Sequence, residues 1–449
     1  MRSEDKMKKI IAVCSAFVFL LASCSEANKP GKDATTEVIS PAPTSSPPVG
    51  QKEEKAPETS EELLSALLTA WEDGNVSDFY DYLSEDMLSL LDEEAFVGVF
   101  DNLTDSFGKI SDFGDYEKKE TDGFDVFSIM ADFENAYSDV TVSIKDLKIA
   151  GITHDDRITE TFEIERKNGV TERYFLLQSG EYELNAVYTF KDKGPSVLLI
   201  PGSGPQDCNE TIGILTPFRD LAVGLAENGV NSLRLEKRTY RYNDKITEAD
   251  GIGEEYVADY SVALEWLRTQ EESECVFLLG HSLGGQIAVE MSKKNDIKGI
   301  ILWSSTPRHL AEISADQFSS LDKDNESVYR LYEGKAKQAT DENAEGLYYF
   351  GASDHYWASY NLLDTIGTLE NSDIPCLILN SSADMQVFPD DIEKWRGLAE
   401  QRDDTVLKVY DEYSHFGYKI DMTDPSAFYR QTDFPKEIIE DIVEFVKSK

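Results

Sequence analysis

The chain has 449 residues, which leaves room for two or three domains at the usual size of about 100–200 residues each. Lys and Arg total 43 against 86 Asp and Glu, so the formal net charge is −43. We therefore expect no nucleic acid partner and no attraction to anionic lipid headgroups, because both require a basic surface. Hydrophobic residues make up 41% and aromatic residues 11% of the chain, which excludes disorder throughout.

The N-terminal residues have the pattern of a secretion signal. A basic segment with Lys8 and Lys9 precedes an apolar stretch over residues 10–21, which is shorter than the roughly 20 residues that a membrane-spanning helix needs. The stretch ends in Leu21-Ala22-Ser23-Cys24 and resembles the bacterial lipobox, whose cysteine is diacylated and becomes the first residue of the mature chain. This resemblance implies a signal peptide over residues 1–23 and a lipid anchor on Cys24. An ordinary cleaved secretory signal is the alternative.

The segment after the anchor predicts a tether. Residues 24–57 are rich in Pro, Ser, Thr, Lys and Glu and contain few large apolar residues, so we expect no packed core there. Together the two segments predict a protein held by lipid on the extracytoplasmic face of the cell membrane. Cys208, Cys275 and Cys376 then remain. Their odd number favours free thiols, and the last two each open an apolar run, which is typical of small core residues.

Residues 58–152 predict a small α+β domain. A capping box from Thr59 to Glu62 opens a helix that Gly74 ends, and further helices are expected over 78–91 and 93–107. Apolar residues then alternate with polar ones, as in half-buried strands: Phe124, Val126, Val140, Val142 and Ile144. This pattern is similar to the nuclear transport factor 2-like domains that precede hydrolase domains in bacterial secreted proteins. No catalytic group of residues is visible in this segment.

Residues 171–449 predict a larger α/β domain. A leading antiparallel hairpin is followed by apolar strands that alternate with amphipathic helices, which is typical of a mostly parallel sheet with helices on both faces. The strands are expected at 174–177, 186–190, 196–200, 230–235, 275–279, 299–303, 376–380 and 405–410, and the helices at 217–229, 256–267, 284–293, 392–399 and 436–446. An insertion over residues 306–373 carries many aromatic residues; these either shape a substrate pocket in a cap or pack the cap against the sheet.

The sharpest motif is Gly280-His281-Ser282-Leu283-Gly284-Gly285. It joins an apolar strand to a helix, as a nucleophile elbow requires. So sharp a turn needs small neighbours and places the serine hydroxyl at a helix N-terminus, where negative charge is stabilised. We therefore predict that Ser282 is a nucleophile and that the His281 side chain points away from the chemistry.

A nucleophilic serine needs a base, and the base needs an orienting carboxylate. Asp384 directly follows the strand at 376–380, and His415 follows the strand at 405–410, so these two residues are the candidates. Asp390 and Asp391 compete with Asp384 but suit the start of the next helix better.

An acyl-transfer intermediate also needs donors for its oxyanion. We expect one from the backbone N–H of Leu283, which follows the nucleophile. The second is assigned to Ser203 in the glycine-rich loop over 201–207. The same loop lacks the Lys-Ser/Thr ending that a phosphate-binding P-loop requires.

These motifs resemble the α/β-hydrolase superfamily, and within it the serine esterases of the dienelactone-hydrolase and acyl-thioesterase-like group. The matching stretches are Gly202-Ser203-Gly204-Pro205-Gln206-Asp207, Leu233-Arg234-Leu235-Glu236-Lys237-Arg238, the elbow, Asp384-Met385-Gln386-Val387 and Ser414-His415-Phe416. Two positions depart from the group: Pro201 replaces the usual His, and Glu236 replaces the usual Asp, which changes the reach of any pairing with Lys237 or Arg238.

The sequence thus predicts a lipid-anchored extracellular serine hydrolase that acts on a small-molecule carboxylic ester or related acyl compound through Ser282, His415 and Asp384. No metal or organic cofactor is expected. Two alternatives stay open: a serine peptidase of the same fold, and a non-catalytic cell-surface binding lipoprotein.

Overall fold

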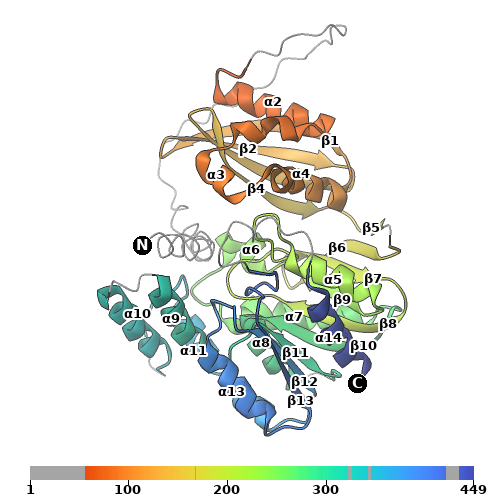
Figure 1. Cartoon of the computed structure of the whole chain (residues 1–449), viewed down its shortest axis with the longest axis vertical. Coiled ribbons are helices and arrows are strands. Elements are labelled where there is room, and N and C mark those ends of the chain that lie inside the picture. Colours follow the sequence, from red (N-terminus) through yellow and green to blue (C-terminus); the bar gives the residue numbers. More distant parts are fainter. Residues whose placement is uncertain (1–55, 167, 295, 322–325, 342–344, 421–433) are drawn as a thin grey trace. The chain divides into compact units, whose positions relative to one another are not determined.

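The computed structural model describes residues 56–449 except 167, 295, 322–325, 342–344 and 421–433. The described residues form two compact units, one that ends at Phe162 and one that begins at Glu163 (Figure 1). The predicted signal peptide, Cys24 and nearly all of the predicted tether lie outside the described residues. Within the described part of the chain, no helix is both long and apolar enough to cross a membrane.

The N-terminal unit packs helices against a four-stranded antiparallel sheet in the order β1-β2-β3-β4 (Figure 1). Its elements are α2 (Ser60–Asp73), the 3-10 helix η1 (Val76–Tyr82), α3 (Glu85–Leu90), α4 (Glu93–Phe107), β1 (Ile110–Thr121), β2 (Phe124–Phe133), β3 (Ala136–Lys145) and β4 (Lys148–Ile158). The side chain of Thr59 accepts a hydrogen bond from the Glu62 N–H at the start of α2, and Gly74 ends the helix with a φ of 72°. Both ends of this helix agree with the sequence prediction.

Two details of this unit go beyond the sequence pattern. The helix expected over 78–91 is interrupted at Leu83, whose backbone is extended, so η1 and α3 are separate elements. In β2 the residues that face the core are Phe127, Ile129, Ala131 and Phe133, whereas Phe124 and Val126 are half-buried. Side chains alternate between the faces of a strand, so this difference of one residue exchanges the two faces.

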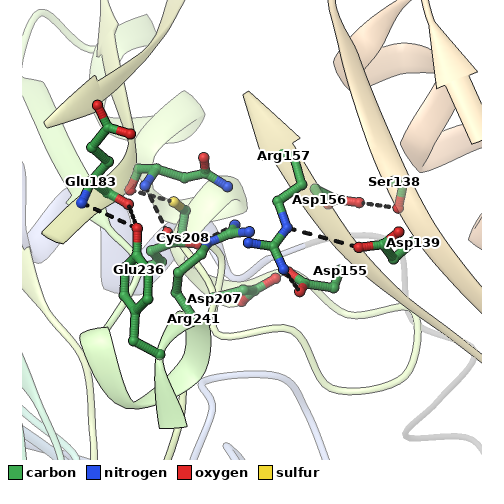
Figure 2. Close-up of polar contacts among 12 residues, drawn as sticks. Ser138, Asp139, Asp155, Asp156, Arg157, Glu183, Asp207, Cys208, Glu236 and Arg241 are labelled. Carbon is green, nitrogen blue, oxygen red and sulfur yellow. Dashed lines mark hydrogen bonds and ion pairs between the residues drawn. The ribbon is translucent and has the colours of Figure 1, made fainter. Parts of the chain in front are cut away.

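Polar residues of β3 and β4 form local pairs, both across the ladder and along β4 (Figure 2). The Ser138 hydroxyl donates to Asp156 at 2.7 Å, and the Arg157 guanidinium pairs with Asp155 at 2.8 Å. The Ser138 side chain is buried, and this hydrogen bond satisfies its hydroxyl.

The larger unit contains a nine-stranded sheet in the order β13-β12-β11-β10-β8-β9-β7-β6-β5. Its strands are β5 (Phe162–Glu165), β6 (Thr171–Ser179), β7 (Tyr182–Phe190), β8 (Gly194–Ile200), β9 (Asn231–Leu235), β10 (Ser273–His281), β11 (Ile300–Trp303), β12 (Cys376–Ser381) and β13 (Thr405–Tyr410). Strands β8 to β13 pair in parallel with one another in the sheet. The hairpin of β6 and β7 joins this parallel part through an antiparallel pairing of β7 with β9. The mostly parallel sheet of an α/β-hydrolase fold, predicted from the sequence, is therefore confirmed.

Helices cover both faces of this sheet (Figure 1). The principal helices are α5 (Pro217–Glu227), α7 (Ala258–Arg268), α8 (Leu283–Ser292), α13 (Pro389–Ala399) and α14 (Lys436–Lys447). Residues of α7, α8 and α13 share one core cluster with alternate residues of the strands, such as Leu278 and Ile378. On the other face, Phe277 meets Phe445 of α14, and Phe218 of α5 meets Trp303. The sheet is therefore buried on both faces, which explains its continuous apolar strands.

The insertion between β11 and β12 carries α9 (Leu310–Leu321), α10 (Glu326–Ala339), α11 (Asp354–Tyr360) and α12 (Thr365–Glu370). Tyr349, Trp357 and Tyr360 belong to the same core cluster as the sheet residues, whereas Tyr348 is 57% exposed. These three aromatic residues of the insertion therefore pack in the core.

Some local expectations for the larger unit also changed. A π-helical turn over Gly253–Val257 precedes α7, so the helix expected from Tyr256 is not regular at its start.

Cys208, Cys275 and Cys376 carry free thiols, as predicted. Cys376 is fully buried, but Cys275 is only half-buried, because it lies near the outer end of β10.

Candidate active site

The four loops that carry the predicted site residues leave the same edge of the sheet. Ser203 follows β8, Ser282 follows β10, Asp384 follows β12 and His415 follows β13. These strands run parallel, so their carboxyl ends meet at one edge, which is where open α/β sheets bind ligands.

Ser282 occupies a strained turn between β10 and α8. Its φ of 53° and ψ of −120° lie outside the regions that a residue with a side chain ordinarily adopts. A Cβ atom on Gly280 would overlap the backbone of Gly284, and a Cβ atom on Gly284 would overlap the Ile200 carbonyl of β8. The glycines therefore permit the close approach that holds the serine in this conformation, as the motif predicts. Ser282 is only half-buried.

Asp384 and His415 are hydrogen-bonded to each other. The Nδ1 atom of His415 lies 2.8 Å from Oδ2 of Asp384, and both side chains are buried. The other carboxylate oxygen, Oδ1, accepts hydrogen bonds from the N–H groups of Gln386 at 2.7 Å and Val387 at 3.1 Å. A carboxylate can only accept, so the proton between the pair is on Nδ1, and Nε2 of a neutral His415 remains an acceptor.

His281 joins the elbow to the loop of His415. Its Nε2 atom donates to the His415 carbonyl at 2.9 Å, and its Nδ1 atom lies 2.8 Å from Oε2 of Glu210. Burial lowers the pKa of His281, but the Glu210 carboxylate and the hydrogen bond to His415 outweigh burial and raise it. The expectation that this side chain points away from the chemistry was incomplete, because its ring lies 4.7 Å from the ring of His415.

The two expected oxyanion donors are backbone N–H groups near the serine. Leu283 is the first residue of α8, so its N–H has no acceptor within the helix. In the loop after β8, the Gly202 N–H donates to Oε1 of Glu210 at 2.6 Å and is unavailable to a ligand. The N–H of Ser203 comes next, on an exposed residue, and no described residue accepts a hydrogen bond from it.

The competing residues have other roles. Asp391 is fully buried and binds Thr306 and Arg308, and Asp390 is exposed in the first turn of α13. His309 bonds to Asn361, and burial lowers its pKa to about 4. Among the described residues, no group of three or more His, Cys, Asp or Glu side chains is arranged to hold a metal ion.

Glu236, which follows β9, does not pair with Lys237 or Arg238, the two neighbours named as its possible partners. Glu236 pairs with Arg241 at 2.7 Å (Figure 2), and neither Lys237 nor Arg238 is its partner. Glu236 also accepts a hydrogen bond from the Asn185 N–H, while the Cys208 thiol donates to the Asn185 carbonyl. Lys237 instead pairs with a glutamate from the π-helical turn, and Arg238 pairs with Asp259 of α7.

Sequence reasoning missed Glu210. This residue has a φ of 51° and is buried, yet it lies in an irregular loop without a motif. Only the folded chain shows that Glu210 lies within reach of both the elbow histidine and the glycine-rich loop. The sequence contains no signal for this proximity.

One match to a known protein family falls within the N-terminal unit. Residues 65–152 match a family described as "Protein of unknown function (DUF3887)". Esterase EstD of Thermotoga maritima is 26% identical over 259 residues, which cover 56% of this chain and 62% of EstD. The chain thus spans less than two thirds of the length of this relative.

Several solved structures are also similar. The esterase Pf2001 of Pyrococcus furiosus has 14% identity and a TM-score of 0.43, over 65% of this chain and 96% of its own. Est1E of Butyrivibrio proteoclasticus has 13% identity and a TM-score of 0.40, over 61% and 99%. A dienelactone hydrolase of Anabaena variabilis has 13% identity and a TM-score of 0.39, over 62% and 98%.

Proposed function

We propose that this protein is a serine hydrolase that cleaves a small-molecule carboxylic ester or a related acyl bond. The observation that carries the proposal is the buried hydrogen bond between Asp384 and His415 at the sheet edge where Ser282 occupies its strained turn. A serine, a histidine and a carboxylate in these roles are sufficient for acyl transfer. The likeness to an enzyme named as an esterase supports the same reaction class.

In this mechanism the Ser282 hydroxyl attacks the ester carbonyl, and Nε2 of His415 takes the hydroxyl proton. The tetrahedral intermediate places its negative oxygen near the N–H groups of Leu283 and Ser203. The intermediate collapses to an acyl-serine, and His415 gives the proton to the departing alcohol. Water then attacks the acyl-serine by the same route and releases the carboxylic acid. Asp384 keeps the proton on Nδ1 and stabilises the imidazolium form of His415.

The experiment offers the purified full chain nitrophenyl acetate, nitrophenyl butyrate and an aminoacyl anilide, with Ser282→Ala as the control. Ester turnover that Ser282→Ala abolishes is the expected result. Turnover of the anilide alone would replace the esterase with a peptidase. No turnover of any substrate, together with no labelling of Ser282 by a fluorophosphonate, would refute the enzymatic function and favour a binding lipoprotein.

We also propose that Cys24 is lipidated and holds the protein on the extracytoplasmic face of the membrane. This rests on the lipobox-like sequence before Cys24. Wild-type protein is expected to incorporate an alkynyl palmitate and to sediment with membranes, whereas Cys24→Ser is not. Incorporation of equal label by the variant would refute the assignment.

A further inference from the structure

Lys237 is a fully buried lysine whose contacts converge on the glycine-rich loop. Its Nζ atom lies 2.6 Å from Oε1 of Glu255, 2.7 Å from the Tyr256 hydroxyl and 2.6 Å from the Gly204 carbonyl. A longer contact of 3.4 Å reaches the Gly202 carbonyl. An ammonium group has three hydrogens, so the three short contacts use all of them. Burial lowers the pKa of Lys237, and the carboxylate of Glu255 opposes that shift.

Tyr256 binds the Gly202 carbonyl of the same loop more closely than Lys237 does. Its hydroxyl donates to the Gly202 carbonyl at 2.5 Å. Because Nζ of Lys237 can only donate, the Tyr256 oxygen accepts from it and turns its own hydrogen towards Gly202. Lys237 and Tyr256 together therefore bind both carbonyl groups, of Gly202 and Gly204, from one side of the loop.

The direction of these carbonyls decides where the Ser203 N–H points. The peptide bond between Gly202 and Ser203 is trans, like every described peptide bond. In a planar trans peptide the C=O and the following N–H point in opposite directions. With the Gly202 carbonyl drawn towards Tyr256, the Ser203 N–H must point to the opposite side of the loop.

The active-site serine lies close to this loop. A Cβ atom added to Gly202 would lie 3.2 Å from Cβ of Ser282. The N–H of Gly202, which belongs to the preceding peptide, is already held by the buried Glu210. The Gly202–Ser203 peptide is held at its carbonyl by the buried Tyr256, and no described residue accepts a hydrogen bond from its Ser203 N–H.

We propose that Lys237 and Tyr256 are positioning residues that aim the Ser203 N–H at the oxyanion of the acyl-transfer intermediate. The inference rests on the proposed esterase function and adds two residues that do not touch the substrate. Lys237 is no base in this arrangement, because each of its hydrogens already has an acceptor.

Tyr256→Phe tests the proposal because it removes only the hydroxyl that binds the Gly202 carbonyl. The loss of one oxyanion donor lowers turnover by about 100- to 1,000-fold. A donor that is still present but no longer held in position should have a smaller effect. We therefore expect kcat for nitrophenyl acetate to fall about 10- to 100-fold with little change in KM. The matched control is Tyr260→Phe. Tyr260 is also fully buried and donates to the Leu235 carbonyl at 3.1 Å, so this variant should keep wild-type turnover.

A transition-state analogue separates positioning from a general loss of structure. An alkyl trifluoromethyl ketone adds to the serine and forms a hemiketal oxyanion, so its inhibition constant should rise in Tyr256→Phe in parallel with the fall in kcat/KM. Activities are normalised to active sites titrated with a fluorophosphonate, which removes the effect of misfolded molecules. Lys237→Met, measured in the same way, serves where Tyr256→Phe gives too little folded protein.

The outcomes are distinct. Loss of kcat with weaker analogue binding, in Tyr256→Phe but not in Tyr260→Phe, supports the proposal. Turnover and analogue binding within about threefold of wild type per active site would overturn it, since a single oxyanion donor is worth far more. If wild-type protein turns over no ester, the proposed function itself fails, independently of Lys237 and Tyr256.

Discussion

Asp384→Asn replaces one carboxylate oxygen with an amide group of nearly the same shape. The structure decides how the new side chain must sit. Oδ1 accepts from the N–H groups of Gln386 and Val387, and an amide nitrogen cannot take that place because it only donates. The asparagine oxygen therefore occupies the Oδ1 position, and its NH₂ group faces Nδ1 of His415 at the Oδ2 position.

This orientation places the histidine proton on the wrong nitrogen. An amide N–H that points at Nδ1 requires an unprotonated Nδ1, so the neutral His415 carries its proton on Nε2 and cannot accept the proton of Ser282. The corresponding substitution in serine proteases lowers kcat by about 10⁴-fold, which corresponds to about 5.5 kcal/mol of activation free energy. We expect a loss of that size, with an unchanged unfolding temperature, because both backbone hydrogen bonds to the side chain survive.

The assay is the steady-state kcat for nitrophenyl acetate at neutral pH, with thermal unfolding followed by circular dichroism. Asp390→Asn is the matched control: it makes the same chemical change on an exposed residue close by in the chain and should leave kcat unaltered. If Asp384→Asn retained more than about a tenth of wild-type kcat, the assigned orienting role would be wrong.

Three further predictions concern buried groups of the larger unit. Gly284→Ala would press a methyl group into the carbonyls of Ile200 and Pro201, and urea denaturation should show a loss of about 1–3 kcal/mol in the free energy of unfolding, or more. Glu172 is fully buried among Arg166, Arg219 and Arg234, which outweigh burial and lower its pKa to about 2. Its stabilisation is present above pH about 4.3 and is lost as the pH falls towards 2, and Glu172→Gln should cost about 3–5 kcal/mol at neutral pH because it leaves the guanidinium groups without their counterion. Glu210→Gln can still accept from Gly202 and can donate to a neutral His281, so turnover should persist. The raised pKa of His281 adds to the free energy of unfolding below pH about 6.5, and this contribution is lost as the pH rises through the folded-state pKa. In Glu210→Gln this contribution should disappear from the pH dependence of the free energy of unfolding. Equal pH dependence in the wild type and the variant would contradict the ion pair.

The sequence could predict that the candidate site residues meet at one edge of the sheet, because each follows a strand of a parallel sheet. Ser282 is in a motif that a strand, a sharp turn and a helix make recognisable, and Asp384 and His415 follow two later apolar strands. Parallel strands bring their carboxyl ends together whatever the length of chain between them. The distance in sequence between these residues therefore did not obscure their proximity.

The register of β2 could not be predicted for the opposite reason. Phe124 and Val126 form an apolar alternation in one register, and Phe127 and Ile129 form one in the other. Both faces of the strand read as apolar over part of its length, so pairing with β3 and the packing of the helices decide which face is buried. Local composition carries no information about that choice.

The residues that hold the glycine-rich loop were equally hidden, and their arrangement explains why. The loop itself supplies only backbone groups to the proposed chemistry, so its orientation depends on what binds its carbonyls and its remaining N–H. Glu210 comes from the same irregular segment, whereas Lys237 follows a neighbouring strand and Tyr256 comes from a π-helical turn. His281 then connects Glu210 to the backbone of His415. A change in the charge of this buried set would therefore reach both the proposed oxyanion donor and the proposed base, although none of these residues need touch the substrate.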